Sequence, residues 1–300
     1  ENNKSLMPDI IFSKGDIRDE FFLKNVFSNA AKNGYAIDGV LHFAGLKSVE
    51  ESVKAPLTYW DNNVLGTINL LKVMELFNCK TIVFSSSATI YGNNNVIPIK
   101  ENIEIKPFNT YGHTKASVEC ILESVSKSSK KKWKIANLRY FNPIGAHETG
   151  LIGEDPLNKP NNLFPYICSV ASGKYDFLNV FGKDWPTFDG TGIRDYIHVV
   201  DLAEAHVITL DYLFKNETDI INLNIGTGIG TSVLELIDAF QEVNKCKVPY
   251  KFCDRRPGDV STLVADNQKA FKLLKWKPKR NLKDMCRDGW RWIKKNPNGY

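Results

Sequence analysis

The chain has 300 residues, of which 43% are hydrophobic and 24% are charged, so it has enough apolar side chains to bury a large core. Its 39 basic and 34 acidic residues leave a formal net charge of +5, too small and too dispersed to predict a dedicated nucleic-acid binder. The densest basic run, at residues 130–134, is expected to be a solvated loop.

Membrane and metal-binding signals are absent from the sequence. No apolar stretch reaches the roughly 18 residues that a membrane-spanning helix needs, and no secretory signal opens the chain. The six cysteines lack the CxxC spacing of metal or redox sites, and the five histidines show no paired spacing. We therefore expect a cytoplasmic protein with reduced thiols, no disulfide bonds, no bound metal, and no membrane or nucleic-acid partner.

Hydrophobic runs alternate with helical periods through the first half of the chain. The predicted elements, in order, are strand 9–12, helix 20–31, strand 39–43, helix 57–77, strand 81–84, helix 111–126 and strand 135–141. Residues 65, 68, 71 and 74 form an apolar stripe on the second helix. This alternation is typical of βαβ units and predicts an α/β fold with a doubly wound parallel sheet.

The alternation breaks after residue 141 into stretches rich in Gly, Pro and Asn. A strand is predicted at residues 220–225, followed by a helix at 233–243 and two C-terminal helices. We therefore divide the chain into a doubly wound domain over residues 1–141 and a smaller substrate-covering region over residues 142–300. The glycines at 226, 228 and 230 are too closely spaced and too late in the chain for a dinucleotide loop, so we predict a turn there.

Small hydroxyl side chains follow the strand predicted at residues 81–84, at the place where a doubly wound sheet holds its ligand. Ser85 and Ser86 are interpreted as cap or turn residues. Ser87, the last of the three, is the residue that we assign to chemistry.

Tyr111 and Lys115 are four residues apart, so their Cβ atoms lie about 5–6 Å apart on one face of a helix. A nearby ammonium favours the tyrosinate, so we expect Lys115 to lower the phenol pKa towards neutrality and make Tyr111 a base for an alcohol proton. Such a pair also arises by chance, and alone it indicates an exposed helix pair. Its position after Ser87 favours catalysis.

A series of ordered motifs then resembles the UDP-glucose 4-epimerases (UDP-galactose 4-epimerases) of the extended short-chain dehydrogenase/reductase superfamily. The resemblance runs from about residue 12 to residue 300, and its motifs lie at residues 42–53, 84–89, 140–147, 153–156, 160–163, 189–199 and 255–259. An ordered series of this kind is far more specific than any single motif.

The resemblance implies a Rossmann-type fold, NAD as the cofactor, and reversible inversion at carbon 4 of UDP-glucose and UDP-galactose. It implies that the catalytic residues are Ser87, Tyr111 and Lys115. The implied cofactor contacts are Asp16, Ile17, Phe43, Ala44, Gly45, Lys47, Asn62, Tyr111, Lys115 and Tyr140, the last as the wall beside the nicotinamide. The implied substrate contacts are Lys47, Ser87, Asn142, Asn162, Leu163, Arg194, Tyr196, Arg256, Asp259 and Leu263.

The chemistry of the implied substrate residues agrees with a nucleotide sugar. Two arginines can bind a diphosphate, and an aspartate can accept hydrogen bonds from ribose hydroxyls. Surface ion pairs are the alternative interpretation of these arginines. Leu263 matches a gate residue that is Tyr in restricted family members and Cys in broad ones, so we expect weak activity on UDP-N-acetylglucosamine and UDP-N-acetylgalactosamine. The family pairs as a homodimer through the helices that resemble residues 57–77 and 111–126.

The family begins with a strand, a glycine-rich turn and a helix that this chain does not supply, so we expect roughly 40 residues to precede it in the parent protein. The expected consequence is poor cofactor binding by the chain alone. Two alternatives stay open. One is a nucleotide-sugar dehydratase or decarboxylase, and dehydratases typically carry an Asp-Glu pair where Ala88 and Thr89 stand. The other is a nucleotide-sensing regulator, which usually lacks the Tyr/Lys pair.

Overall fold

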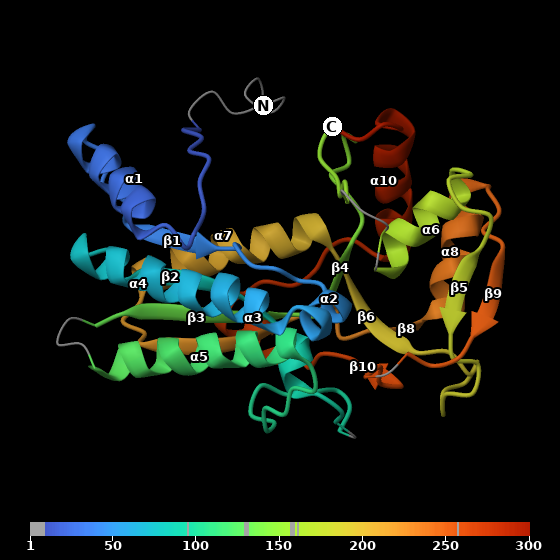
Figure 1. The fold of residues 1–300 in the computed structure, drawn as a ribbon. Helices are drawn as coiled ribbons and strands as arrows, with labels where there is room; N and C mark the ends of the chain where they lie inside the picture. The colour runs from blue at the N-terminus through green and yellow to red at the C-terminus, as the bar shows by residue number, and fades with distance from the viewer. Residues whose placement is uncertain (1–9, 95, 129–131, 157–159, 161, 257) are drawn as a thin grey trace.

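The computed structural model describes residues 10–94, 96–128, 132–156, 160, 162–256 and 258–300. Residue 9 of the predicted first strand and residues 130 and 131 of the basic run lie outside this part of the chain. So do residues 161 and 257 of two motifs. A larger and a smaller lobe lie side by side, and the chain passes between them more than once (Figure 1).

The described residues of the larger lobe build a sheet of four parallel strands in the order β1–β2–β3–β7. These strands are β1 (Gly39–His42), β2 (Thr81–Ser87), β3 (Lys134–Tyr140) and β7 (Ile220–Ile225). Ser87 is in register with Tyr140, and Tyr140 is in register with Ile225. The carboxyl ends of these strands therefore meet at one edge of the sheet, where a doubly wound fold binds its ligands.

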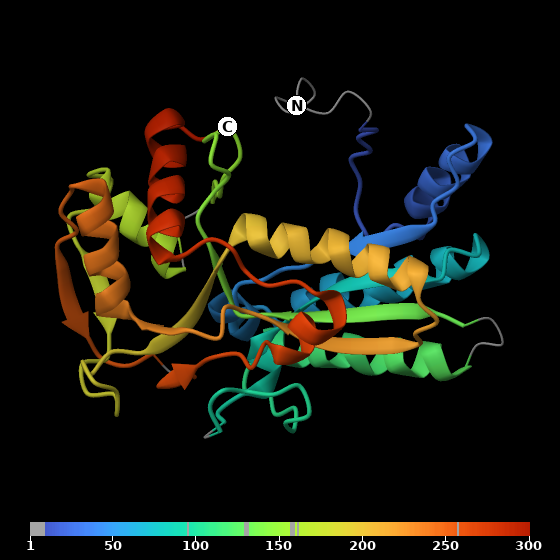
Figure 2. The same ribbon diagram turned by 180° about the vertical axis from the view of Figure 1, so that it is seen from behind.

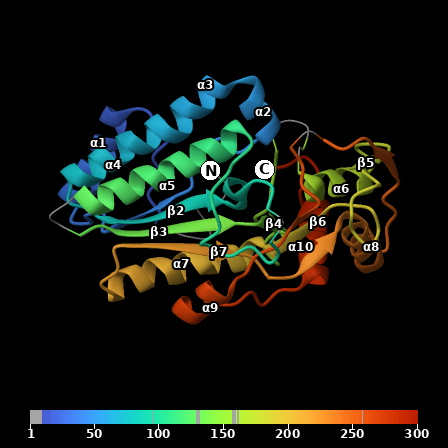
Figure 3. The same cartoon turned by 90° about the horizontal axis from the view of Figure 1, so that it is seen from below.

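Helices cover both faces of this sheet (Figure 3). One face carries α1 (Glu20–Lys32), α4 (Gly66–Leu76) and α5 (Thr110–Ser128), and the other carries α7 (Val199–Lys215) and α9 (Gln268–Leu274). Alternate side chains of β2 enter the two layers, because Ile82 and Phe84 belong to the core on the α4 and α5 side and Val83 belongs to the core on the α7 side. The predicted doubly wound α/β fold is confirmed.

The smaller lobe packs three helices around a core of its own: α6 (Leu163–Ala171), α8 (Val233–Asn244) and α10 (Leu282–Lys295). Two strands of this lobe, β5 (Leu178–Phe181) and β9 (Tyr250–Cys253), pair in parallel. A further sheet between the lobes consists of β4 (Asn142–Ile144), β6 (Ile193–His198), β8 (Gly230–Ser232) and β10 (Thr262–Leu263). Strand β6 pairs with the other three, so it is the centre of this connecting sheet.

The chain crosses the predicted division at residue 141 more than once. Strand β7 completes the sheet of the larger lobe, and α7 and α9 cover that sheet from behind (Figure 2), although all three come from the second half of the chain. The division into residues 1–141 and 142–300 therefore stays a prediction. The sheet order shows that the first half alone does not build the complete described sheet.

The strand predicted at residues 9–12 is wrong for the residues that the structure describes. Ile10, Ile11 and Phe12 are in no strand, and their side chains are 58%, 78% and 72% exposed. An apolar run becomes a strand only where a neighbouring strand accepts its hydrogen bonds, and the described part of the chain offers these residues no such neighbour.

The interpretation of Ser85 and Ser86 as cap or turn residues is also wrong. Strand β2 continues through Ser87, and Ser85 and Ser86 pair with Leu138 and Arg139 of β3. The strand extends through the serines because their backbone groups find partners on β3.

The helix predicted at residues 57–77 consists of three helical segments. They are α3 (Pro56–Tyr59), a π-helical turn η1 (Trp60–Leu65) and α4. The wider π turn rotates the helix, so Leu65 is 44% exposed whereas Leu71 and Met74 of the predicted stripe are buried. Two short helices, α2 (Val49–Lys54) and the 3-10 turn η2 (Ala88–Tyr91), were not predicted.

Within the described residues, no helix is both long and apolar enough to cross a membrane. The same residues contain no group of three His, Cys, Asp or Glu side chains arranged to hold a metal ion. All six cysteines lie in the described part of the chain and are free thiols.

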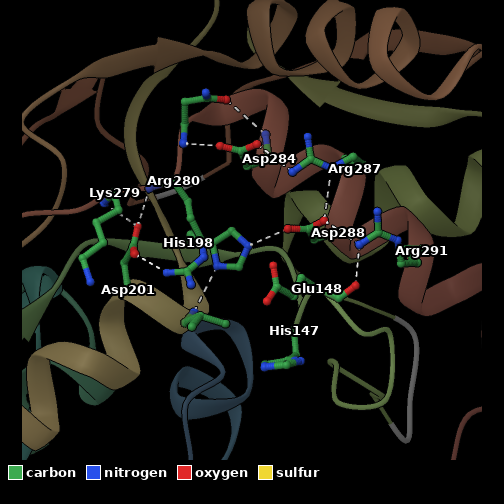
Figure 4. Close-up of polar contacts among 12 residues, drawn as sticks. His147, Glu148, His198, Asp201, Lys279, Arg280, Asp284, Arg287, Asp288 and Arg291 are labelled. Carbon is green, nitrogen blue, oxygen red and sulfur yellow. Dashed lines mark hydrogen bonds and ion pairs between the residues drawn. The ribbon is translucent and has the colours of Figure 1, made fainter.

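A cluster of charged side chains joins α7 to α10 and to the loop before α10 (Figure 4). Asp201 is fully buried and accepts hydrogen bonds from the backbone N–H groups of Lys279 (3.0 Å) and Arg280 (2.9 Å) and from Arg280 Nη1 (2.5 Å). His198 Nε2 lies 3.4 Å from Asp288 Oδ2, and both side chains are buried. These contacts hold the C-terminal helix of the smaller lobe against the start of α7.

We predict that Asp201→Ala lowers the free energy of unfolding by about 3 kcal/mol, because it removes a fully buried carboxylate and leaves two partly buried N–H groups and a partly buried guanidinium without their acceptor. Urea denaturation followed by circular dichroism measures this change. Lys283→Ala is the matched control, because Lys283 and its partner Glu242 are 58% and 61% exposed. Equal denaturation midpoints for the two variants would contradict the prediction.

Candidate active site

The candidate active site lies where β2 and β3 end and α5 begins. Ser87 is the last residue of β2 and is 9% exposed, and Tyr111 and Lys115 stand on the first turns of α5. The backbone N–H of Tyr111 donates to Ser52 Oγ of α2 at 3.1 Å, which holds the start of α5 in place. The structure therefore brings together the three residues that the resemblance implies for catalysis.

Ser87 and Tyr111 are joined by a hydrogen bond between their side chains. The Ser87 hydroxyl also accepts from the backbone N–H and the hydroxyl of Thr89, at 3.2 and 3.0 Å. These contacts orient the serine oxygen towards the phenol. One substrate hydroxyl bound here would meet both side chains.

Lys115 is buried beneath the same edge of the sheet, with 5% of its surface exposed. Its ammonium donates to the backbone carbonyl of Ser85 at 2.6 Å and lies 4.8 Å from the ring centroid of Phe84. Burial disfavours the charged form and lowers the pKa of Lys115 to about 8. The ammonium is therefore a weakly solvated cation that an incoming hydroxyl or anion would stabilise.

The predicted effect of Lys115 on Tyr111 is wrong for this structure. Burial raises the pKa of Tyr111, and the hydrogen bond from Ser87 only partly offsets that rise. The Lys115 ammonium lies 5.8 Å from the centroid of the Tyr111 ring and is engaged by the Ser85 carbonyl. Desolvation therefore outweighs the influence of Lys115 on the phenol.

Tyr140, at the end of β3, borders the site beside Tyr111. Its hydroxyl is hydrogen-bonded to Nε2 of His206 on α7 and to the side chain of Ser85. Phe43, which follows β1 and is 55% exposed, places its ring 4.7 Å from the ring of His206. Two implied cofactor contacts, Phe43 and Tyr140, therefore both contact the buried imidazole of His206.

The loop after β1 approaches the catalytic side chains closely. Gly45 lies beside Lys115, since a Cβ at Gly45 would be 3.5 Å from the Lys115 Nζ. Asn63 holds the loop: its side chain accepts from the Leu46 N–H (2.8 Å), and donates to the Leu46 carbonyl (3.0 Å) and to Thr114 Oγ1 (3.1 Å). Ala44 is an exposed residue of the same loop.

The implied adenine contacts lie at the outer end of this side of the sheet. Asp16 is exposed and pairs with Arg18, whose hydrogen bonds lower the Asp16 pKa to about 2. Arg18 also contacts Asp61, and the Ile17 side chain packs against Gly66. Asn62, next to Asp61, donates its side-chain amide to Asn63 at 3.0 Å. These contacts place Asp16, Ile17 and Asn62 along one continuous surface.

The donors around this surface fit a dinucleotide. The Lys115 ammonium has three N–H donors, and the Ser85 carbonyl is the acceptor found for it among the described residues. Its other donors suit the hydroxyls of a ribose. Gly45 has no side chain, so it leaves room for a ligand beside the Lys115 ammonium.

Four implied substrate residues gather on the smaller-lobe side of the site. Arg194 and Tyr196 are two residues apart on β6. Arg194 lies within electrostatic range of Tyr196, Arg256 and Asp259. Burial lowers the pKa of Arg194 and raises the pKa of Tyr196 to about 12. Arg256 is exposed and pairs with Asp259 at 3.2 Å. The group presents two cationic side chains and one carboxylate to a ligand.

The other implied substrate residues line the same region less closely. Leu263 on β10 is in register with Arg194 and packs against the cluster that includes Ala88 and Phe141. Asn142 opens β4 in register with Tyr196. The exposed Asn162 and the partly buried Leu163 lie at the start of α6.

Lys47 links the two lobes. Its ammonium pairs with Glu154 Oε1 at 3.0 Å, and 70% of the lysine side chain is exposed. A ligand that contacts Lys47 would compete with this ion pair. The roles of Lys47 and of the other implied site residues stay predictions.

Three features of the site were missed in the sequence. They are the loop clamp Asn63, the buried His206, and the buried ion pair between Glu119 and Arg139 at 2.7 Å. Asn63 directly follows the implied contact Asn62, and only the burial of Asn63 distinguishes the two asparagines. His206 and the ion pair depend on contacts between segments far apart in the chain, which periodicity does not reveal.

Known proteins match both the sequence and this fold. The family described as GDP-mannose 4,6 dehydratase matches residues 1–289. The UDP-glucose 4-epimerase of Bacillus subtilis (strain 168) is 51% identical over 292 residues, which cover 97% of this chain and 84% of that protein. The bifunctional UDP-glucose 4-epimerase and UDP-xylose 4-epimerase 3 of Arabidopsis thaliana is 49% identical over 290 residues, which cover 96% of this chain and 81% of that protein.

The solved structures agree. The crystal structure of UDP-glucose 4-epimerase from Bifidobacterium longum in complex with NAD+ and UDP has a TM-score of 0.92 and 45% sequence identity, and the match covers 99% of this chain and 87% of that one. With its strand-end hydroxyl, its Tyr/Lys helix and these relatives, the chain belongs to the UDP-glucose 4-epimerase family of the extended short-chain dehydrogenase/reductase superfamily.

Proposed function

We propose that this protein catalyses the NAD-dependent, reversible inversion of carbon 4 between UDP-galactose and UDP-glucose. The observation that carries the proposal is the cluster of Ser87, Tyr111 and Lys115 at the end of β2, with Tyr140 and Phe43 beside it. The names and ligands of the relatives support it.

The residues of the cluster divide the work of one proton transfer. Tyr111 accepts the proton of the 4-hydroxyl, and Ser87 hydrogen-bonds the same oxygen. Lys115 donates to the cofactor ribose and supplies positive charge beside the phenol. NAD, when bound, supplies the hydride acceptor at carbon 4. Once the 4-keto sugar has turned over, the same hydride would return to the opposite face of carbon 4 while Tyr111 returns the proton to the oxygen, and the opposite configuration would result.

The smaller lobe supplies the proposed grip on the nucleotide. Arg194 and Arg256 bind the diphosphate, and Asp259 accepts hydrogen bonds from the ribose. The proposed cofactor contacts follow the surface formed by Asp16, Ile17, Asn62 and the loop at residues 43–47. A cytoplasmic location stays a prediction from the cysteine spacing.

A dehydratase of the same superfamily is the second candidate, and the description of the matching family favours it. Ala88 and Thr89 stand where dehydratases typically carry Asp and Glu, and both residues begin the η2 turn. The site therefore lacks the second acid and base that elimination requires. A regulator without catalysis is disfavoured by the intact Tyr111 and Lys115 pair.

We further propose that the protein is a homodimer that pairs through α3, η1, α4 and α5. Leu57 of α3 is 81% exposed and Leu65 of η1 is 44% exposed. A cavity of about 130 Å³ between α4 and α5 is lined mainly by apolar side chains, among them Ile68, Leu71, Ile121 and Val125. Apolar positions outside the core-facing stripe are typical of a helix that packs against a second subunit.

The proposed base predicts the outcome of Tyr111→Phe. The wild-type protein should convert UDP-galactose to UDP-glucose, and the variant should turn over at least about 10²-fold more slowly while its affinity for UDP stays nearly unchanged. Chromatography of the two UDP-hexoses measures turnover, and calorimetry measures UDP binding. A variant that keeps most of its activity would show that Tyr111 is not the base, and dehydrated products would favour the second candidate.

The proposed dimer predicts that Leu65→Lys raises the dimer dissociation constant at least about tenfold, because an ammonium replaces an apolar contact at the interface. Sedimentation velocity at micromolar concentrations measures it. Leu151→Lys is the matched control, since Leu151 is 47% exposed in the other lobe. A monomeric wild-type protein, or equal behaviour of the two variants, would refute the proposed interface.

Substrate breadth is predicted to depend on Leu263. A branched aliphatic side chain leaves more room than a phenol, so we expect strong activity on UDP-galactose and weak but measurable activity on UDP-N-acetylglucosamine. Leu263→Tyr should narrow the space where the sugar turns and lower the activity on the acetylated substrate relative to UDP-galactose. An unchanged activity ratio would show that Leu263 is not the gate.

A further inference from the structure

His206 is a buried histidine for which the proposed reaction has no role. It lies on α7, is 2% exposed, and contacts both Phe43 and Tyr140, with ring centroids 4.7 and 5.2 Å away. These two residues come from the ends of different strands, β1 and β3. One imidazole therefore supports both aromatic side chains at the edge of the candidate cofactor site.

The hydrogen bonds of His206 determine its tautomer. Its Nδ1 lies 2.8 Å from the backbone carbonyl of Leu202, which can only accept, so Nδ1 carries the proton. Burial lowers the pKa of His206 and keeps the ring neutral. Nε2 is then an acceptor, and the hydroxyl of Tyr140 must donate to it.

The single proton of the Tyr140 hydroxyl is therefore already donated to His206. Because the phenol has no second proton, the side chain of Ser85 can only donate to the phenol oxygen. The chain of donors runs from Ser85 to Tyr140 to His206 and then to the Leu202 carbonyl. Tyr140 can offer a ligand only a lone pair.

We propose that His206 is a positioning residue that fixes Tyr140 as a hydrogen-bond acceptor, and that the group it selects is the carboxamide N–H of the nicotinamide. This inference rests on the proposed use of NAD. It assigns the recognition of that amide to a buried residue of α7, from the second half of the chain, which need not touch the cofactor itself.

The test compares the binding of NAD with that of its 3-acetylpyridine analogue, in which a methyl group replaces the amide NH₂. Calorimetry on full-length protein freed of bound dinucleotide gives both dissociation constants for the wild type, Tyr140→Phe, His206→Phe and His206→Gln. One hydrogen bond corresponds to about a fivefold change in affinity. The preference for NAD should fall about fivefold in both Phe variants. It should persist in His206→Gln, whose amide oxygen can accept from Tyr140.

A double variant separates positioning from a general loss of packing. Tyr140→Phe combined with His206→Phe should show the same preference as Tyr140→Phe alone, because the histidine acts through the phenol hydroxyl. The inference is overturned if His206→Phe keeps the wild-type preference, if His206→Gln loses it, or if the double variant falls further. Full-length wild-type protein that binds neither dinucleotide would overturn the cofactor proposal itself, whereas binding without these changes would overturn only the inference.

Discussion

The buried ion pair between Glu119 and Arg139 holds α5, the helix of the candidate site, on the sheet. Arg139 of β3 binds both carboxylate oxygens of Glu119 on α5, at 3.0 and 2.7 Å, and both side chains are buried. Ser86 of β2 donates to the same carboxylate at 2.5 Å. One carboxylate thus ties α5 to two strands. Glu119 lies one helical turn after Lys115, and Ser86 precedes Ser87, so the pair sets the distance between the helix-borne and strand-borne parts of the site.

Burial away from water shifts the pKa values of the titratable side chains in this site. Burial lowers the pKa of Lys115 and raises the pKa of Tyr111, so each side chain is driven towards its neutral form. Tyr111 can accept a proton readily only when a positive charge lies beside its oxygen. In the proposed reaction the strength of the base therefore depends on what occupies the cofactor site. Proton removal would be coupled to the presence of a hydride acceptor.

Local patterns in the sequence predicted the elements that carry the chemistry, and long-range packing decided the rest. The alternating strands and the spacing of Tyr111 and Lys115 are local, and β2 and α5 lie close to their predicted places. The pairing of β7 with β3 joins segments about 85 residues apart, and no local pattern in the sequence could have predicted it. The predicted strand at residues 9–12 failed for the converse reason, since a local pattern does not guarantee a partner.

In the proposed reaction the two lobes must bind the two ends of the substrate with different strength, because the sugar has to turn over. The nucleotide has to stay bound while the sugar rotates, so the firm contacts belong at one end of the ligand. Strand β6 provides a rigid base for that end, because buried Asp195 accepts from the backbone N–H groups of Thr227 (2.7 Å), Gly228 (2.9 Å) and Ala265 (3.2 Å). These bonds tie the turn before β8 and the segment after β10 to Asp195, the residue next to Arg194 on β6. In the proposed reaction the sugar end would meet mainly Ser87, Tyr111 and an aliphatic side chain, a combination that would orient one hydroxyl and leave the ring free to rotate about the diphosphate.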